Sequence, residues 1–225
     1  MKILAFDTAC GTCSVVILED SVVLRYLQES RLHMQAERLM LMIEEVMMGH
    51  DYNTVTHIAI TVGPGSFTGI RIGLACAHGI ALSTNIKIFA LTTLDSVAYQ
   101  AQNTLNGPQH RFLVALSAGR QQYYTQYFFT IHGEIPITDS EITLMEHGAL
   151  EEICNDIPIY GNFDYIALQK KEHIMPEAIS TARFAHWQLR QNQQSKLAPL
   201  PLYIREHDAV IPKIFTNNTK KSPLL

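Results

Sequence analysis

The feature that most constrains this chain is a glycine-rich run at residues 63–73, which reads GPGSFTGIRIG. It follows an apolar, strand-like segment at residues 58–62 and leads into a stretch of small residues that ends near Ser83. A glycine-rich turn between a strand and a helix indicates that a backbone or a phosphate comes very close. A phosphate at this turn would favour an enzyme, whereas a protein backbone would favour a partner for one.

Two common phosphate-binding motifs do not match this run. A Walker A loop requires a lysine directly after its last glycine, but Ile70 follows Gly69, and no lysine occurs between Lys2 and Lys87. A dinucleotide-binding fingerprint requires a third glycine where Thr68 stands. We therefore predict a tight turn with close packing of a helix on a strand, rather than a phosphate loop.

The segment after the run predicts a helix at residues 68–83 that has one side of small residues. A glycine inside a helix costs about 1 kcal/mol relative to alanine, which is tolerable where it lets another helix approach closely. The approaching helix could belong to the same chain or to another subunit. The small residues recur at every fourth position and so form one ridge: Gly69, Gly73, Ala77 and Ala81.

Residues 33–48 predict a second helix that is apolar around much of its girth, which indicates burial on more than one side. One stripe contains Ala36, Leu39, Met40, Ile43, Val46 and Met47, and another side carries Met34, Leu41 and Met48. Methionine is common at protein-binding surfaces, although a core helix is an equally good interpretation. We predict that both helices contribute to an intersubunit interface, through Met34, Leu41, Met48, Gly69, Arg71, Gly73, Ala77 and Ala81.

Few residues in the sequence indicate a catalytic, metal-binding or phosphate-binding site. Asp7 and Thr8 end the first strand, where acidic residues of sugar-kinase-like folds hold a metal–phosphate group; capping of the turn is the favoured alternative. Cys10 and Cys13 form a C-x-x-C pair between two strand-like runs, which favours small buried thiols over a redox or zinc site. We predict no catalytic residue and no metal site in this chain.

Composition narrows the classes of partner. The formal net charge is -4 and the isoelectric point is near 6.2, which disfavours nucleic-acid binding through this chain alone. The sequence begins with a strand-like segment, and no apolar run reaches membrane-spanning length. We expect a cytoplasmic protein without membrane association.

The pattern of apolar residues predicts three short strands at residues 2–7, 13–18 and 21–28, followed by alternating helices and strands. This order is typical of a ribonuclease H-like unit. An Asn-Gly-Pro break at residues 106–108 predicts a boundary. We therefore predict an N-terminal half at 1–104, a smaller half at 105–215 and a disordered tail at 216–225.

The segment at residues 3–15 (ILAFDTACGTCSV), residues 33–39 and above all the glycine-rich run resemble the TsaB family, also called YeaZ. The resemblance implies an α/β, actin-like ATPase (ASKHA) fold of two ribonuclease H-like halves, whose mixed sheets are flanked by helices. It implies a non-catalytic scaffold that activates the catalytic subunit TsaD in adding a threonylcarbamoyl group to tRNA adenosine next to the anticodon. The ATPase TsaE joins the pair, and the chain alone is expected to form a homodimer.

The resemblance also implies that this chain binds no cofactor alone, that ATP and metal belong to the partner subunits, and that tRNA contact comes only through the complex. The metal-binding histidine pair of TsaD falls on Thr93 and Val97 here. Many family members read D-A-R-x-x-E-x-Y in the second half, where this chain has Ser117, Gly119 and Gln122 in place of the charged residues. The alternative is a free-standing ASKHA-type nucleotide-binding enzyme or glycoprotease-like peptidase that uses Asp7 and the glycine turn.

Overall fold

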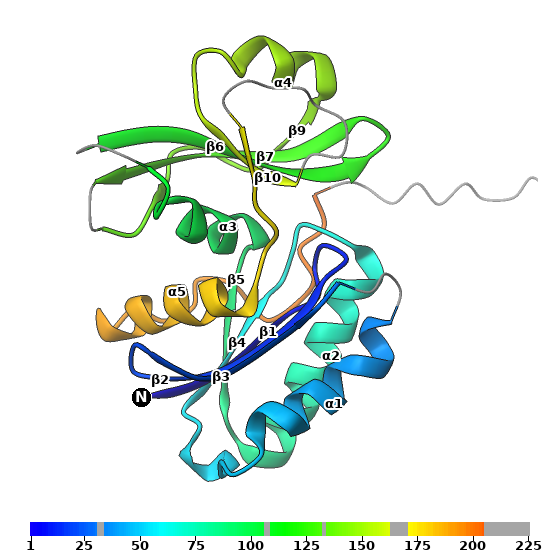
Figure 1. Cartoon of the computed structure of the whole chain (residues 1–225), viewed down its shortest axis with the longest axis vertical. Coiled ribbons are helices and arrows are strands. Elements are labelled where there is room, and N and C mark those ends of the chain that lie inside the picture. Colours follow the sequence, from blue (N-terminus) through cyan, green and yellow to red (C-terminus); the bar gives the residue numbers. More distant parts are fainter. Residues whose placement is uncertain (31–33, 106–108, 132–133, 163–170, 205–225) are drawn as a thin grey trace, which may run out of the picture.

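The fold contains two β-sheets, which lie one above the other in Figure 1. The computed structural model describes residues 1–30, 34–105, 109–131, 134–162 and 171–204. The first sheet has the strand order β3-β2-β1-β4-β5. Its strands are β1 (Lys2–Asp7), β2 (Cys13–Glu19), β3 (Val22–Glu29), β4 (His57–Thr61) and β5 (Lys87–Leu91). The three N-terminal strands form an antiparallel meander, and β4 and β5 extend the sheet in parallel with β1.

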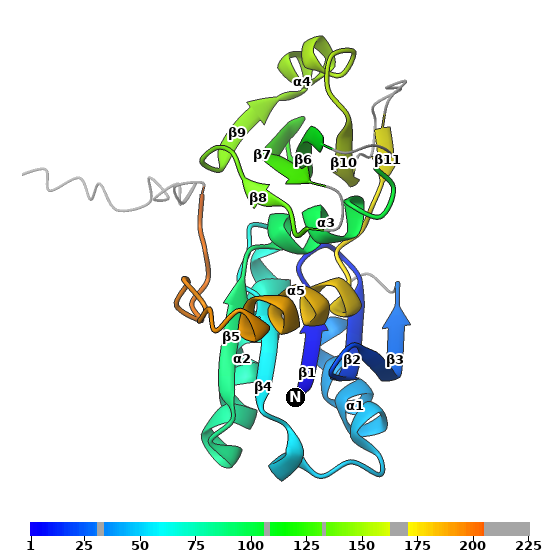
Figure 2. The same cartoon turned by 90° about the vertical axis from the view of Figure 1, so that its left-hand side faces the viewer.

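Helices cover both faces of the first sheet, as Figures 1 and 2 show. On one face lie α1 (Gln35–Met47) and α2 (Phe67–Thr84), and on the other lies α5 (Ala178–Arg190). Leu4 and Phe6 of β1 pack in the core with α1 and α2, whereas Ile3 and Ala5 pack in the core with α5. Because both faces are covered, β1 is an unbroken apolar run instead of an alternating one.

The second sheet has the order β11-β10-β6-β7-β8, with β9 also paired to β7. Its strands are β6 (Gln109–Gly119), β7 (Gln122–Ile131), β8 (Ile137–Thr138), β9 (Thr143–Glu146), β10 (Ile159–Asn162) and β11 (Lys171–His173). The long β6–β7 hairpin is antiparallel, while β10 and β11 run parallel to β6. The helix α3 (Thr93–Ala101) packs on one face of this sheet and α4 (His147–Ile153) on the other.

The layers of helix and sheet match the predicted ASKHA arrangement, and the described residues of the predicted half at 105–215 are divided between the two sheets. After β11 the chain returns to the first sheet, where α5 contacts β1, β2, β4 and β5. There α5 meets α3: Ser96 Oγ and Thr181 Oγ1 are 3.0 Å apart, and the rings of Tyr99 and Phe184 meet edge to face. One face of the first sheet is therefore covered by α5, a helix from late in the sequence.

Helix α1 buries a slightly different stripe from the predicted one. Leu39, Ile43, Val46 and Met47 are buried as expected, but Met40 is 44% exposed and Met42 is buried in its place. Sequence reasoning also missed the 3-10 turn η1 (Tyr52–Thr54) and the strands β10 and β11. These strands are only four and three residues long, so their own patterns carry little signal.

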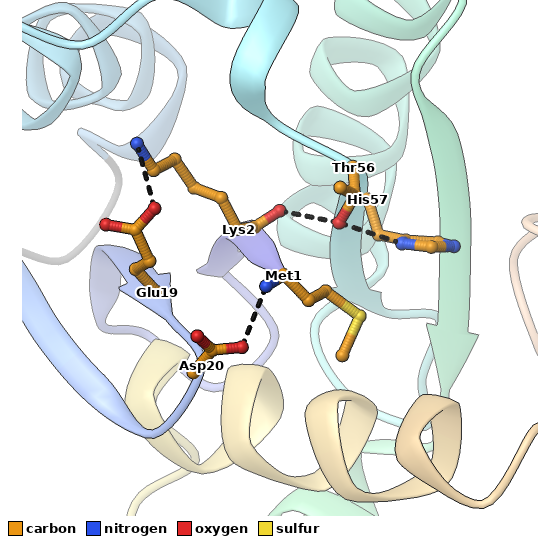
Figure 3. A network of polar contacts seen from close by, with 6 residues as sticks. All are labelled: Met1, Lys2, Glu19, Asp20, Thr56 and His57. Carbon is orange, nitrogen blue, oxygen red and sulfur yellow. Dashed lines mark hydrogen bonds and ion pairs between the residues drawn. The ribbon is translucent and has the colours of Figure 1, made fainter.

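A polar network closes the lower end of the first sheet and is drawn in Figure 3. The amino group of Met1 lies 2.8 Å from Asp20 Oδ1, and Lys2 Nζ lies 3.4 Å from Glu19 Oε1. The hydroxyl of Thr56 donates to the carbonyl oxygen of Lys2 at 2.8 Å. The network joins the start of β1 to the β2–β3 turn and to the loop that leads into β4.

Candidate functional site

The glycine-rich run brings α2 into very close contact with the loop after β1. A Cβ atom on Gly69 would lie 2.0 Å from the carbonyl oxygen of Thr8, and one on Gly65 would lie 2.5 Å from the carbonyl oxygen of Ala9. The amide of Ser66 donates to the Ala9 carbonyl at 2.7 Å, and the Thr8 hydroxyl donates to the Gly69 carbonyl at 2.7 Å. Only glycine fits such an approach. The predicted close approach is confirmed, and at Gly65 and Gly69 the approaching segment is the loop after β1.

This packing corrects part of the predicted interface. Gly69, Gly73 and Ala77 are buried on the inner side of α2, and a Cβ atom on Gly73 would lie 2.8 Å from Thr8 Oγ1 and 3.1 Å from a methyl carbon of Ile60. The small ridge therefore lets α2 approach this chain's own strands, and these three residues cannot contact a second subunit. The sequence could not decide this, because a ridge of small residues has the same pattern whichever partner it faces.

The remaining predicted interface residues lie on or near the outer side of the two helices. Leu41 and Met48 of the α1 region are 52% and 67% exposed, Arg71 is exposed, and Met34 and Ala81 are partly buried. Four further residues extend this surface, and sequence reasoning missed them: Met40, Ala75, Gly79 and Leu82. We call Met40, Leu41, Met48, Ala75, Gly79 and Leu82 the outer helix face.

The two helices are joined at this face by a contact of 3.2 Å between Cys76 Sγ and Met40 Sδ. Leu82 is 87% exposed, and a Cβ atom on Gly79 would meet nothing within 4 Å. Gly79 therefore differs from Gly69, because no contact inside the described chain requires a glycine there. The sequence signal that could have revealed this face was the spacing of residues 75, 79 and 82, because these positions share one side of a helix.

A C-terminal strap, which we define as residues 195–204, borders the outer side of α2. The amide of Leu202 donates to the Val62 carbonyl at 2.8 Å, and His78 Nε2 lies 2.7 Å from the Pro199 carbonyl oxygen. At its end, Arg71 Nε donates to the Tyr203 hydroxyl at 2.9 Å, while the guanidinium lies 3.6 Å from the centre of the Phe67 ring. Arg71 is thus held by its own chain through hydrogen bonding and a cation–π contact.

Asp7 and Thr8, the weak candidates for a metal–phosphate site, are buried within the β1–β2 loop. Asp7 Oδ1 accepts from the Ala9 amide at 3.0 Å, and Oδ2 accepts from the Thr61 hydroxyl at 2.5 Å. Burial raises the pKa of Asp7, although both hydrogen bonds act in the opposite direction. Since both carboxylate oxygens already have donors, the geometry supports the alternative in which Asp7 caps the turn.

The cysteine pair consists of Cys10 in the same loop and Cys13 at the start of β2. Burial and the nearby carboxylate of Asp7 raise the pKa of Cys10, and they raise that of Cys13 to about 12. A thiol nucleophile or metal ligand needs the thiolate form, which this environment disfavours. All four cysteines are free. Among the described residues, no group of three or more His, Cys, Asp or Glu side chains could hold a metal ion.

A cleft of about 670 Å³ separates the β1–β2 loop and the start of α2 from the second sheet. The first sheet's side contributes Cys10, Gln35, Ser66 and Thr68, and the second contributes Ser117, Ala118, Tyr124 and Asn162. The amide of Ser117, the first of the residues that replace the charged family pattern, donates to Asn162 Oδ1 of β10 at 2.7 Å. No acidic or basic side chain lines the described part of this cleft. The described lining therefore offers hydroxyl, amide and thiol groups but no carboxylate, imidazole or amine.

No described helix combines the length and apolar character that a membrane crossing requires. The predicted disordered tail at 216–225 and the predicted break at residues 106–108 lie outside the described residues.

Comparison with known proteins agrees with this architecture. Residues 29–141 match the family model described as TsaD, tRNA N6-adenosine threonylcarbamoyltransferase. The tRNA threonylcarbamoyladenosine biosynthesis protein TsaB of Escherichia coli (strain K12) is 35% identical over 127 residues, which are 55% of this chain and 53% of that protein. The chain thus spans about half the length of that relative. The TsaB protein of Buchnera aphidicola subsp. Baizongia pistaciae is 33% identical over 155 residues, covering 67% of this chain and 69% of that protein.

A solved structure shares the fold. The crystal structure of an uncharacterized protein with similarity to peptidase YEAZ, from Pseudomonas aeruginosa, has a TM-score of 0.76 at 22% identity. It covers 91% of this chain and 99% of that chain. The family model, the two relatives and the shared fold lead to one conclusion: the chain belongs to the TsaB/YeaZ family.

Proposed function

We propose that this chain is a non-catalytic subunit of the complex that adds a threonylcarbamoyl group to tRNA adenosine next to the anticodon. In this role it binds and activates a TsaD-like catalytic subunit, and a TsaE-like ATPase joins the pair. ATP and metal bind in those partners, and tRNA is reached through the complex. The names of the relatives support the pathway, and the geometry of the outer helix face supports the role of a binding subunit.

The observation that carries the proposal is the combination of exposed apolar side chains and an unneeded glycine on the outer helix face. Leu41, Met48 and Leu82 are all more than half exposed. Burying one such side chain contributes about 1.5–3 kcal/mol, so leaving three in water is costly unless a partner covers them. Gly79 adds room for close approach by a helix. The partner that fits is a protein with its own apolar helix pair, such as a TsaD-like subunit or, in its absence, a second copy of this chain.

The cleft between the sheets supports a non-catalytic role. Enzymes that transfer groups place acids, bases or metals where charge develops. In this chain the described cleft lining is uncharged, and the nearby Asp7 is buried with both oxygens bonded. We therefore assign the acids, bases and metal ions that the reaction needs to the partner subunit.

The direct test is reconstitution of the modification with a TsaD-like subunit, a TsaE-like ATPase, threonine, bicarbonate, ATP and tRNA. Omitting this chain should abolish or strongly reduce product, and equal product without it would refute the proposal. Co-purification from cells, followed by identification of the bound proteins, gives an independent readout.

The surface is tested by Leu82→Asp. The substitution removes the gain from burying Leu82 and places a charge in the interface. Affinity for the TsaD-like subunit should therefore fall at least about tenfold. The matched control is Val22→Asp, since Val22 is 60% exposed on the β2–β3 side and outside the outer helix face. The interface assignment fails if the two variants bind the partner equally well while both remain folded.

A further inference from the structure

Two cavities lie next to each other on the α5 side of the first sheet, away from the outer helix face. The first, which we call the apolar cavity, has a volume of about 360 Å³ and mainly aromatic and aliphatic walls: Phe89, Leu91, Ile135, Phe184 and Trp187. The second, which we call the basic cavity, has a volume of about 550 Å³ and lies against the starts of β4 and β5. The two cavities adjoin, because four residues line both of them: Phe89, Gln193, Gln194 and Leu197.

Strand β5 runs along both cavities and presents one continuous row of side chains to them. Lys87, Phe89 and Leu91 are two positions apart and so share a face of the strand, and the packing of Phe89 and Leu91 in the core with α5 identifies it as the α5 face. Neighbours in such a row are about 6–7 Å apart. A molecule that lies along β5 with a charged group at Lys87 therefore places its next carbon atoms over Phe89 and Leu91.

The basic cavity holds two basic side chains, Lys87 and His57, which we call the basic pair. His57 of β4 is the register partner of Lys87, and it shares the α5 face with Ala59. No acidic side chain lines the described part of this cavity. The carbonyl groups of residues 187–189 at the end of α5 already accept from backbone amides of the following loop, so they do not need the lysine as a cap. The cavity therefore offers positive charge to an anion.

Thr56 determines which nitrogen of His57 can bind a ligand. The Thr56 hydroxyl donates to the Lys2 carbonyl oxygen at 2.8 Å, and its oxygen lies 3.2 Å from His57 Nδ1, as Figure 3 shows. Because the hydroxyl proton is already used, the Thr56 oxygen accepts from Nδ1, which carries the ring proton. In the neutral ring Nε2 then has no proton, and it becomes a donor when the ring is charged. An anion that binds at Nε2 therefore binds together with a proton.

The other charged groups at this end of the sheet act elsewhere. The ammonium groups of Met1 and Lys2 form the two ion pairs drawn in Figure 3. On α5, the charges of His186 and Arg190 act on Asp20. Burial lowers the pKa of the histidine in the basic pair, and the charge of the neighbouring lysine lowers it further. The two members of the basic pair are therefore electrostatically coupled to each other.

We propose that the two cavities together bind an aliphatic carboxylate, with the carboxylate at the basic pair and the hydrocarbon chain in the apolar cavity. The chain lies along Phe89 and Leu91, where burial is favourable, and the carboxylate accepts from the basic pair. Lys196 also lines the apolar cavity, but the carboxyl group of Asp95 lies near it. We therefore place the carboxylate at the basic pair, where no described acid competes with it. The site is separate from the outer helix face and does not depend on the proposed complex.

Octanoate is the probe, and Trp187 reports its arrival by fluorescence, because it lines the apolar cavity and is the only tryptophan of the chain. From butyrate to octanoate, each added methylene should tighten binding about three- to fourfold. Octanol has the same chain without a charge, so it should bind at least about tenfold more weakly than octanoate. No response to octanoate at millimolar concentration by fluorescence and calorimetry, or equal affinity for octanol, would overturn the proposal.

Lys87→Met removes the ammonium group and keeps an unbranched side chain. Octanoate affinity should fall at least about tenfold while octanol affinity stays unchanged, a combination that damage to the fold would not produce. The matched control is Arg183→Met, since Arg183 is an exposed residue of α5 that lines neither cavity. If Lys196→Met weakens octanoate binding and Lys87→Met does not, the carboxylate lies at the other end and the proposal fails.

The pH dependence of binding tests His57. A carboxylate ligand stays ionised above about pH 5, whereas the ring of His57 is neutral at pH 8 and gains a proton as pH falls. Octanoate affinity should therefore rise about tenfold between about pH 8 and about pH 5.5, because the charged ring adds a hydrogen bond to the carboxylate. In His57→Gln this rise should disappear. An equal rise in folded His57→Gln contradicts the assignment of His57.

Discussion

The two glycines Gly69 and Gly79 occupy the same helix, α2, but only the first is required by packing. Gly69→Ala and Gly79→Ala add the same methyl group in the same type of backbone. At Gly79 the new atom meets nothing within 4 Å, whereas at Gly69 it would lie 2.0 Å from the Thr8 carbonyl oxygen. Because helix propensity favours alanine equally at both sites, the pair isolates the effect of the contact with the β1–β2 loop.

The expected changes in unfolding free energy have opposite signs. Gly79→Ala should stabilise the protein by about 0.5–1 kcal/mol through reduced backbone entropy in the unfolded state. At Gly69, ordinary contact begins at 3.4 Å, so the Thr8 carbonyl would have to retreat by about 1.4 Å. Overpacking of this kind costs about 1–3 kcal/mol. Loss of the hydrogen bond from Thr8 Oγ1 to the Gly69 carbonyl adds about 1 kcal/mol, which roughly offsets the propensity gain.

Urea unfolding followed by Trp187 fluorescence measures both changes, and thermal unfolding provides a second scale. For a chain of this size, 1 kcal/mol corresponds to about 2–4 °C in Tm. Gly79→Ala should therefore melt slightly above the parent protein, and Gly69→Ala several degrees below it. If Gly69→Ala is as stable as the parent protein, α2 does not approach the loop this closely, and the inward assignment of the ridge is wrong.

Two further predictions concern buried ionisable groups. Burial raises the pKa of Asp7, so its contribution to stability is fully present below the unfolded pKa near about 3.9 and is lost as pH rises through the folded pKa. Asp7→Asn should therefore gain stability relative to the parent protein as pH rises above about 4 in urea unfolding, and a pH-independent difference would contradict this reasoning. Partial burial raises the pKa of Cys76 to about 11, so only about one thiol in a thousand is ionised at pH 8. Iodoacetamide should modify Cys76 about 100-fold more slowly than free cysteine by mass spectrometry, and comparable rates would exclude such burial.

Local signals were sufficient for most elements of the first sheet. The apolar pattern predicted the three N-terminal strands and the alternation of helices and strands that follows them, and Thr92 caps α3 within the same stretch. Such elements are specified by periodicity and by capping residues that lie within a few positions of one another. The glycine-rich run was likewise correctly interpreted as a device for close packing.

The sequence could not show which element packs against each side of a helix. The inner ridge of α2 and its outer positions both contain small residues, and only the fold decides which side faces the sheet. The same applies to the contact between α3 and α5, where Ser96 and Thr181 are 85 positions apart in sequence and meet because α5 returns to the first sheet. Long-range placement of this kind leaves no periodic trace in either segment.

The late return of α5 also has a consequence for how the chain is made. Until the ribosome has released residues 178–190, one face of the first sheet lacks its cover, and Ile3, Ala5, Val16 and Leu18 have no helix to pack against. Strands β1 and β2 therefore wait for α5, and the nascent sheet exposes an apolar face throughout translation of the second sheet. Closure of this face therefore comes only after translation of the second sheet, and it depends on α5 of the same chain.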